Sequence, residues 1–284
     1  MAPLSIDNAG TPLLVFDEHG GVGGWWGPVT SSIDWCEHNY VVSPYIAEFF
    51  NTMSNVGMVL LGLLTMYLHL RDGSELRYVL AGFTLFFIGV GSTAFHGTLT
   101  HVGQQGDETP MVIGSAVWCW CLGFHDPAFE ARHAALQWWS AVCIGVFVVL
   151  FGVLHYIYSF VVVFQVLILV LSTVMISTLT SMWRRDPLRG ILTGPFVVYI
   201  GSMAIAFALW LVDQHFCAHL HTLPGGLPNP QFHAWWHLLA GVNCYLGPVI
   251  EGAIRLAARG KKPRLVWLLG CIPYPTAARE SNKD

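Results

Sequence analysis

Three histidines in this sequence have the spacing expected of a metal site. His233 and His237 are four residues apart in the segment QFHAWWH, so on a helix both imidazoles face the same way. His96 ends another apolar segment, in GSTAFHGT. Three neutral imidazoles hold zinc and leave its fourth position open, which is the arrangement of a catalytic zinc site. A lone histidine pair could instead form hydrogen bonds at a membrane interface, but a third histidine at the same depth favours the metal.

Proton transfer at such a site would need another group. In the zincin motif HEXXH a glutamate follows the first histidine, but here that position is Ala234. Asp107, in the segment GDETP, is the nearest candidate. Its carboxylate could take a proton from water and pass it to a leaving amine. The alternative is that Asp107 caps the N-terminus of a helix, a role that Glu108 or Thr109 could share.

Two further polar residues end apolar segments beside the histidines. Ser92 is four residues before His96, so the two share one helix face. Ser92 could donate a hydrogen bond to an oxyanion, or it could be a small residue that lets two helices pack closely. Asp213 could accept a hydrogen bond from the free nitrogen of a metal-bound histidine, or it could only cap the loop that follows it.

A second polar group lies in the segment IDWCEHNYVVSPYIAEFFN. It offers the hard oxygen atoms that Ca²⁺ prefers, of which this ion binds about six to eight. The candidate ligands are the side chains of Asp34, Glu37, Asn39 and Glu48 and the backbone carbonyl of Trp35. The spacing is not that of an EF-hand, so a polar loop with turn residues is the alternative. Glu48 lies in the first turns of an apolar helix with Asn51 and Asn55 on its face, so that face should look into a bundle.

Long apolar segments carry these residues. Hydrophobic residues make up 54% of the 284 residues and charged residues only 11%, whereas soluble proteins carry about 25% charged residues. The net charge of −4 gives no sign of a nucleic-acid-binding surface. Because a bilayer-spanning helix needs about 20 apolar residues, the sequence predicts an all-α integral membrane bundle. The seven predicted helices are 45–70, 78–99, 108–124, 134–154, 157–182, 191–212 and 231–257.

The basic residues predict how this bundle is oriented. All 13 lysines and arginines fall at one predicted end, in the connections after the first, third and fifth helices, at the end of the seventh helix and in the C-terminal tail. The positive-inside rule makes that end cytosolic. We therefore expect residues 1–44 to form a luminal segment that contains the candidate calcium loop. Residues 45–257 would form the catalytic membrane domain, and residues 258–284 a basic cytosolic tail.

The remaining cysteines and histidines give one further structural prediction. Of the seven cysteines, only Cys36 and Cys217 lie in predicted luminal segments, where an oxidising compartment permits a disulfide. The bridge would require Cα atoms within about 7 Å of each other. Most other histidines, His155 among them, lie in predicted loops or helix ends, as is typical of ordinary interfacial residues.

Taken together, these motifs resemble those of the alkaline ceramidases. The resemblance runs from about Trp25 to Pro275. It is carried by WGPVTSSIDWCEHNYVVSPYIAEFFNTMSN, GSTAFHGTL, the aspartate of GDETPM, WLVDQHFC and QFHAWWH. It implies a seven-helix enzyme of the endoplasmic reticulum, Golgi or related membranes. Such an enzyme hydrolyses the amide bond of the lipid ceramide to give a sphingosine-type base and a free fatty acid.

The resemblance also implies a role for each candidate residue. Zinc would be held by His96, His233 and His237, with Ser92 and Asp107 assisting. Calcium would be held by Asp34, Trp35, Glu37, Asn39 and Glu48, and a Cys36–Cys217 bridge is expected. The alternatives are a seven-helix lipid receptor with a zinc site, similar to adiponectin-receptor-like proteins, and a hydrolase of another lipid amide or ester. An acid and a serine beside an open three-histidine site favour an enzyme.

Overall fold

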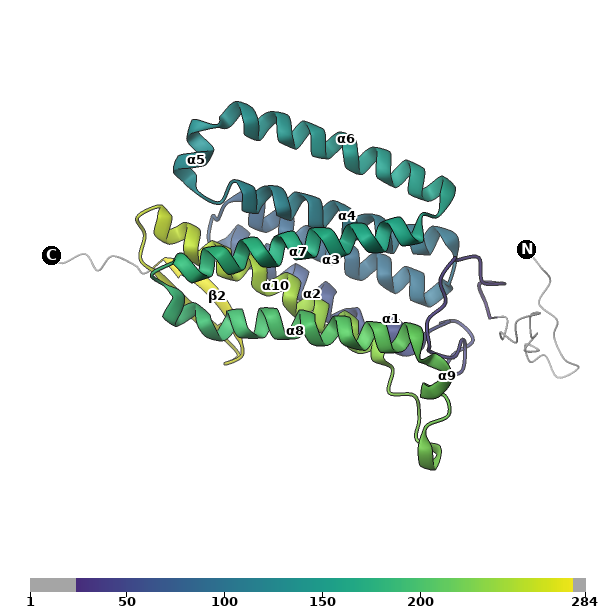
Figure 1. Cartoon of the computed structure of the whole chain (residues 1–284). Coiled ribbons are helices and arrows are strands. Elements are labelled where there is room, and N and C mark those ends of the chain that lie inside the picture. The colour runs from purple at the N-terminus through teal and green to yellow at the C-terminus, as the bar shows by residue number, and fades with distance from the viewer. Residues whose placement is uncertain (1–23, 278–284) are drawn as a thin grey trace, which may run out of the picture.

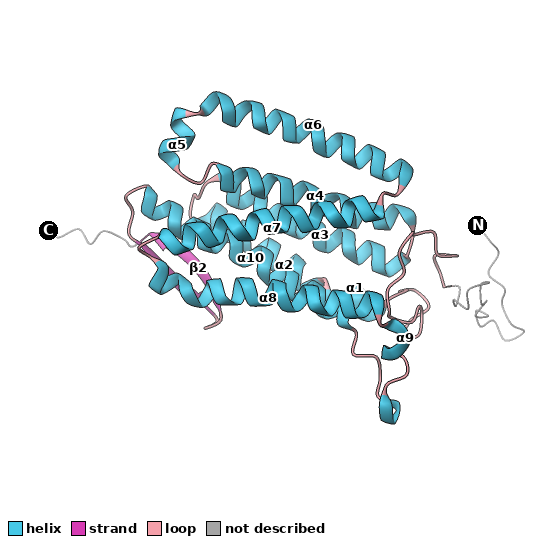
Figure 2. Ribbon diagram, in the orientation of Figure 1, coloured by secondary structure: helices cyan, strands magenta, loops and turns pink. Residues whose placement is uncertain are grey.

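The protein is a bundle of long helices. The computed structural model describes residues 24–277, and helices make up most of this part (Figure 2). Seven long helical segments lie along one another in it (Figure 1). They are α1 with α2 (Phe49–Ser54 and Val56–Arg71), α3 (Leu76–Thr98), α4 (His101–Gly123), α6 (Ala134–Tyr158), α7 (Val161–Arg185), α8 (Arg189–His215) and α10 (Phe232–Ala258). The short elements are α5 (Pro127–Arg132), α9 (Cys217–Leu220), η1 (Pro224–Gly226), β1 (Pro263–Leu268) and β2 (Ile272–Ala277).

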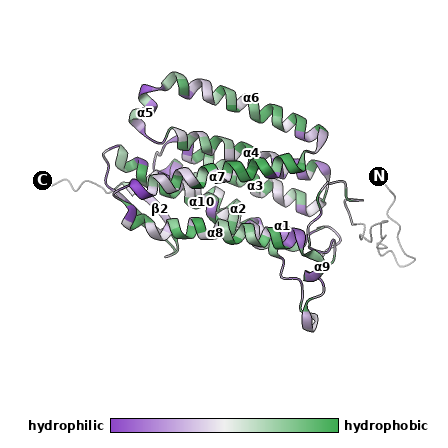
Figure 3. Cartoon of the chain, in the orientation of Figure 1, coloured by the Kyte–Doolittle hydropathy of each residue, from purple (hydrophilic) through white to green (hydrophobic). Residues whose placement is uncertain are grey.

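Five of the long segments are apolar and long enough to cross a membrane. These are α1 with α2, α3, α6, α7 and α8. The helices α6 and α7 are strongly hydrophobic (Figure 3), and many of their apolar side chains, such as Val149 and Val162, are exposed. Exposed apolar faces of this length are typical of a multi-pass membrane protein. The other two long helices, α4 and α10, carry more polar residues, which become the residues of the candidate site.

The largest hydrophobic core of the described residues joins α2, α3, α4, α7, α8 and α10. Its fully or almost fully buried members include Leu85, Leu179, Leu192 and Ile250. Because lipid tails are as apolar as these side chains, close packing rather than water exclusion holds such helices together. The core therefore fixes the position of α10, which carries two of the three candidate metal-binding histidines.

The two ends of the bundle differ in charge. Figure 1 shows α5 and β2 at one end and α1 and α9 at the other. At the α5 end, Arg77 and Arg255 both form ion pairs with Glu75 and with Glu130 of α5. These pairs join the ends of α3 and α10 to α5, and they bring basic residues from distant parts of the sequence to the same end, as the charge pattern predicted. Arg279 and Lys283, and the first 23 residues of the predicted luminal segment, lie outside the described residues.

The predicted start of the third long helix was wrong. α4 begins at His101, seven residues before the predicted start at position 108, and the Thr100 hydroxyl caps it by accepting a 3.1 Å hydrogen bond from the Gly103 amide. Asp107 therefore lies in the second turn of α4 and does not cap its N-terminus. The polar segment before it had indicated a loop, but buried partners allow these side chains to lie in a helix.

The predicted break between the fourth and fifth helices was also misplaced. α6 continues past His155 to Tyr158, and the chain turns at Ser159, which has a left-handed φ of 50°. His155 thus lies in the last turn of α6 and is completely buried, rather than in an interfacial loop.

A β-hairpin follows the last helix, which the sequence had suggested only as a basic tail. β1 and β2 pair antiparallel, with Pro263 opposite Ala277 and Leu268 opposite Ile272. The Tyr274 hydroxyl donates a 3.2 Å hydrogen bond to the carbonyl of Leu68 at the end of α2. The Tyr245 hydroxyl of α10 donates a 2.8 Å hydrogen bond to the carbonyl of Pro273. The hairpin is therefore attached to the basic end of the bundle.

The helices α3 and α4 approach very closely at one pair of glycines. A Cβ atom at Gly91 would lie 1.9 Å from the carbonyl oxygen of Gly106, so this crossing requires glycine at position 91. Pro110, inside α4, has no amide hydrogen to donate to the Gly106 carbonyl four residues earlier. The close crossing sets the distance between the residues that follow the two glycines, Ser92 and Asp107.

Candidate metal centre and its cavity

His96, His233 and His237 lie together at one end of the bundle. One ring nitrogen of each lies within 4.8 Å of one from each of the others. The ring centroids are 4.6 to 5.0 Å apart, and no ring is more than 3% exposed. The helices α3 and α10 thus bring together the three histidines that the sequence singled out.

Neighbouring groups hold these rings in place. The Nδ1 atom of His96 hydrogen-bonds to the Glu48 carboxyl group. The Nδ1 atom of His237 lies 2.8 Å from the Ser54 hydroxyl and 3.1 Å from the Asn51 carbonyl.

The His233 ring stacks on the indole of Trp35, with a centroid separation of 3.7 Å. Such outer contacts fix the orientation and tautomer of metal-binding imidazoles.

The nitrogens left over fit a metal ion. The Nε2 atom of His96 and the Nδ1 atom of His233 are buried and have no hydrogen-bond partner among the described residues. Leaving a buried polar atom without a partner costs about 1–3 kcal/mol. Zinc would give these nitrogens a partner, because it accepts three neutral imidazoles.

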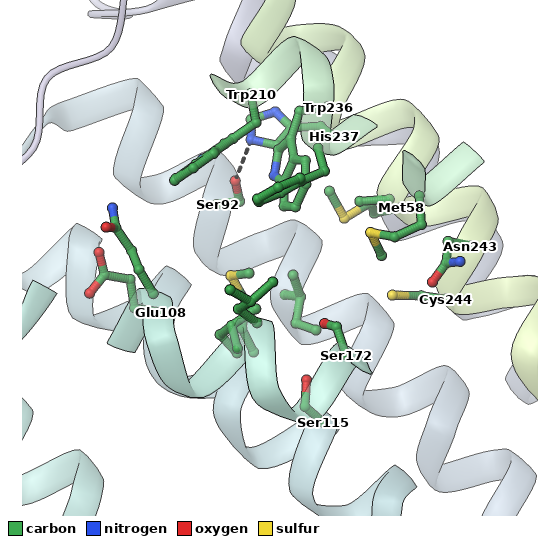
Figure 4. A pocket seen from close by; sticks show the side chains of 18 of the residues that line it. Met58, Ser92, Glu108, Ser115, Ser172, Trp210, Trp236, His237, Asn243 and Cys244 are labelled. Atoms are coloured by element: carbon green, nitrogen blue, oxygen red, sulfur yellow. Dashed lines mark hydrogen bonds between the residues drawn. The ribbon is translucent and has the colours of Figure 1, made fainter. Parts of the chain in front are cut away.

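Ser92 and Asp107 lie beside this cluster. The Ser92 hydroxyl is 3.4 Å from Nε2 of His237, as the dashed line in Figure 4 marks. The side chains of Ser92 and Asp107 lie near each other across the α3–α4 crossing, and both are buried. A hydroxyl and a carboxyl group therefore stand next to the nitrogen cluster, one from each of the two helices that cross at Gly91.

Asp213 contacts the site in a different way from the one considered in the sequence. Its carboxylate accepts 3.2 Å hydrogen bonds from two backbone amides, those of Cys36 and His233. Neither of these hydrogen bonds comes from a histidine ring. Asp213 instead attaches the loop around Cys36 to the N-terminal turn of α10, and so positions the backbone of His233.

The candidate calcium residues gather only in part. Glu48 accepts a 3.0 Å hydrogen bond from the Trp35 amide and also hydrogen-bonds to Asp34. The Asn39 amide group donates to both carboxylate oxygens of Asp34 at 3.1 and 3.3 Å. Glu37 instead accepts hydrogen bonds from the backbone amides of Phe50 and Asn51 in α1, at 2.7 and 2.8 Å.

Two features of this loop fit a cation. The Oδ1 atom of Asn39 is buried without a partner among the described residues. Burial raises the pKa of both Glu37 and Glu48 to about 7, because desolvation disfavours their charged forms. A Ca²⁺ ion would offset that cost and would give the amide oxygen a partner.

A disulfide closes the loop onto the rest of the protein. Cys36 and Cys217 are bonded, with their Cα atoms 5.3 Å apart, so this prediction is confirmed. The bond joins segments 181 residues apart in the sequence. His221 lies 3.5 Å from the Cys36 sulfur and stacks on His38, so these two histidines pack around the bridge.

A largely apolar cavity of about 380 Å³ leads away from the histidines. Side chains of α3, α4, α7, α8 and α10 line it, including Phe164, Ile168, Met203 and Phe207. Figure 4 shows Ser92, His237, Trp210 and Trp236 at one end of the cavity, and Ser115, Ser172, Asn243 and Cys244 farther along it. This shape suits a molecule with a polar reacting group and a long apolar chain.

Sequence reasoning missed two kinds of residue. Ser54 holds His237 but carries no motif of its own, so only the fold reveals it. Glu108 and His155 form a buried hydrogen-bonded pair next to Asp107, although the sequence suggested a cap and an interfacial residue. Their signal was the presence of ionisable groups within predicted membrane helices or at their ends.

Comparison with known proteins agrees with this geometry. The sequence pattern of the Ceramidase family matches residues 27–276. The chain is 32% identical to alkaline ceramidase 3 of Mus musculus, an alignment that covers 88% of this chain and 93% of the mouse protein. It is 31% identical to an alkaline ceramidase of Arabidopsis thaliana, over 89% of this chain and 95% of the plant protein. It is 36% identical to an alkaline ceramidase of Saccharomyces cerevisiae, over 79% of this chain and 76% of the yeast protein. The chain belongs to the ceramidase family.

Proposed function

We propose that this protein is a zinc-dependent ceramidase, which hydrolyses the amide bond of ceramide. The observation that carries this proposal is the buried three-histidine cluster at one end of an apolar cavity, with Ser92 and Asp107 beside it. The relatives named alkaline ceramidases support it. The products would be a sphingosine-type base and a free fatty acid.

The chemistry divides between the metal and the side chains. Zinc held by His96, His233 and His237 would polarise the amide carbonyl and lower the pKa of water to about 7. Asp107 would accept a proton from the attacking water and deliver it to the nitrogen of the leaving amine. Ser92 would donate a hydrogen bond to the carbonyl oxygen as negative charge develops on it. A carbon–oxygen bond forms, the carbon–nitrogen bond breaks, and the amine leaves as a neutral group.

Calcium would have a separate role in the same protein. We infer that Asp34, Glu37, Asn39 and Glu48, with the Trp35 carbonyl, bind Ca²⁺. The ion would stabilise the loop against the start of α1. Because Glu48 also contacts His96, this loop is connected to the catalytic centre.

The membrane arrangement follows from the same reasoning. We infer that α4 and α10 cross the membrane with the five apolar segments, which gives seven spans. The site end would then face the lumen, and the C-terminal hairpin the cytosol, in the endoplasmic reticulum or Golgi membrane. Ceramide would enter from the bilayer with its chains between the helices.

The test of the proposed reaction is direct. Purified protein in detergent is incubated with a panel of ceramides at neutral and alkaline pH, and released sphingoid base is measured by mass spectrometry. His233→Ala should abolish release and lower the zinc content, while the protein still inserts into membranes. His219→Ala, on the exposed surface of α9, is the matched control and should keep both. Full activity of His233→Ala would contradict the zinc assignment, and a panel without turnover by the wild type would favour the receptor class.

A further inference from the structure

A buried chain of hydrogen bonds runs past Asp107 from the luminal loop to α6. The Ser32 amide and hydroxyl donate to Oε1 of Gln104, at 2.8 and 2.9 Å. The Gln104 amide group donates to Oε1 of Glu108 at 2.9 Å. The other carboxyl oxygen of Glu108 hydrogen-bonds to Nε2 of His155. We call this set the Ser32–His155 chain.

The Ser32–His155 chain lies in surroundings where burying a polar group costs free energy. Gln104 and His155 are completely buried and Glu108 is 3% exposed. The His155 ring stacks against Phe151 and Phe164, with centroids 5.1 and 5.8 Å away. Ionisable residues at such depth are costly, and low polarity strengthens the hydrogen bonds that satisfy them. Packing alone would be served as well by apolar side chains of similar volume.

Two members of the Ser32–His155 chain, Gln104 and Glu108, lie on either side of Asp107 in the sequence of α4. Glu108 is the next residue, and Gln104 lies three residues earlier, so they occupy the same helical turns. Asp107 itself contacts Ser92 across the close α3–α4 crossing, and both Asp107 and Glu108 line the cavity. The Ser32–His155 chain thus holds this part of α4 from two sides, through the luminal loop and through α6.

We propose that Gln104, Glu108 and His155 are positioning residues that hold Asp107 in line for proton transfer. Both carboxyl oxygens of Glu108 already have partners, so its contribution is made through the helix and not by contact with the substrate. The inference rests on the proposed function. A displacement of about 1 Å in a catalytic group can lower the rate about 100-fold, so a modest shift of α4 is enough.

The direction of each hydrogen bond provides a test by exchange. Gln104 accepts from Ser32 through its oxygen, so its amide group must donate to Glu108. Gln104→Glu would place two carboxyl groups against each other. In Glu108→Gln, the amide group at position 108 would face either the amide group of Gln104 or Nε2 of His155, and both of these donate to Glu108 in the wild type. The double variant has the same composition as the wild type. In the double variant, the carboxylate at position 104 accepts hydrogen bonds from Ser32 and from the side-chain amide group at position 108. The side-chain oxygen at position 108 still accepts from His155.

The experiment measures kcat, KM and zinc content for the four proteins with ceramide in detergent. Each single variant should lower kcat by about 10- to 100-fold with little change in KM or zinc content. If the two single losses were independent, the kcat of the double variant would be reduced by their product. The measured kcat of the double variant should be about tenfold higher than that, because the effects of contacting residues are commonly not additive. His155→Phe keeps a ring between Phe151 and Phe164 but loses the hydrogen bond, and it should behave like the single variants.

Phe151→Leu is the matched control, because it loosens the packing of α6 but leaves the hydrogen bonds in place. It should lower thermal stability and keep kcat. The proposal is overturned if the single variants keep kcat and lose only stability, if the exchange gives no recovery, or if Phe151→Leu lowers kcat as much as His155→Phe does. An active wild type with an inactive His233→Ala variant would keep the proposed function in each of these cases, so the two failures are distinguishable.

Discussion

Glu48 belongs to both candidate metal sites. One carboxyl oxygen accepts the Trp35 amide of the calcium loop, and the other contacts Nδ1 of His96 and accepts from the Asn51 amide group. The carboxylate of Glu37 instead accepts hydrogen bonds from the backbone amides of Phe50 and Asn51 at the start of α1. Variants of these residues can therefore separate the effects of the two metals.

Glu48→Ala should remove the Ca²⁺ dependence of ceramide hydrolysis and also weaken zinc binding by about 10- to 100-fold, because it removes the outer partner of a metal-bound imidazole. Glu37→Gln should change the Ca²⁺ response and leave the zinc content unchanged, because the hydrogen bonds of Glu37 go to backbone amides of α1. The measurements are activity against free Ca²⁺ concentration and metal content by mass spectrometry. An unchanged Ca²⁺ response in Glu48→Ala would reject the calcium site.

The sequence could predict the metal-binding residues better than the residues that orient them. Helical spacing places His233 beside His237, and the charge pattern places His96 at the same end. The contacts made by Ser54, Asp213 and His155 depend on which helices become neighbours, and no local pattern encodes that. Asp213 shows the difference clearly, since the sequence left open whether it contacts an imidazole or caps a loop, and in the fold it accepts two backbone amides.

Among the helices, the α3–α4 crossing is the contact that sets the distance between Ser92 and Asp107, the two candidate catalytic residues. The glycines on its two sides are not equivalent. A Cβ atom at Gly91 would collide with the Gly106 carbonyl, whereas one at Gly106 would have no other atom within 4 Å. A small residue is therefore required on one helix only.

Gly91→Ala should lower stability by about 1–3 kcal/mol, as overpacking does, and should lower kcat because α4 carries Asp107 away from Ser92. Gly106→Ala, at the same crossing and next to Asp107, should keep both. Thermal unfolding in detergent and ceramide turnover report the two effects. Equal losses in both variants would show that general packing, and not this contact, is responsible.

Helix existence was easier to predict than helix boundaries. All seven predicted segments are helical, because long apolar runs at membrane-helix length are a strong pattern. The first turns of α4 were missed because Gln104, Gln105 and Asp107 are polar, and hydropathy does not include the partners they find in the fold. The hairpin 263–277 was missed because two prolines in β2 interrupt the usual strand pattern.

For the molecule as a whole, orientation is a testable consequence of the charge at its two ends. An acceptor sequence Asn-X-Thr inserted after Gly226, in the exposed loop before α10, should be glycosylated in cells. The same sequence inserted after Gly260, between α10 and β1, should not be, because that end is expected in the cytosol. Electrophoretic mobility before and after glycosidase treatment distinguishes the outcomes. The opposite pattern would reverse the predicted orientation.

The Cys36–Cys217 bond is a covalent connection between the loop that carries Cys36 and the connection between α8 and α10. Replacing both cysteines by serine should cost about 2–5 kcal/mol of stability and weaken Ca²⁺ binding, because the loop loses its attachment. Cys271→Ser, at an exposed cysteine in the hairpin, is the control. Thermal unfolding with and without a thiol reductant measures the difference. A reductant-independent midpoint in the wild type would contradict this role.

The apolar cavity determines which measure of substrate concentration should govern the reaction rate. The cavity that leads to the histidine cluster is lined by α7 and α8, and the outer faces of these helices are exposed and apolar. We therefore expect the substrate to reach the cluster from the lipid bilayer and not from the aqueous phase. The rate should then follow the mole fraction of ceramide among the lipids and not its amount per volume of buffer. Adding inert detergent at a constant total ceramide concentration should slow the reaction by surface dilution, whereas diluting the whole mixture with buffer should change the turnover per molecule much less.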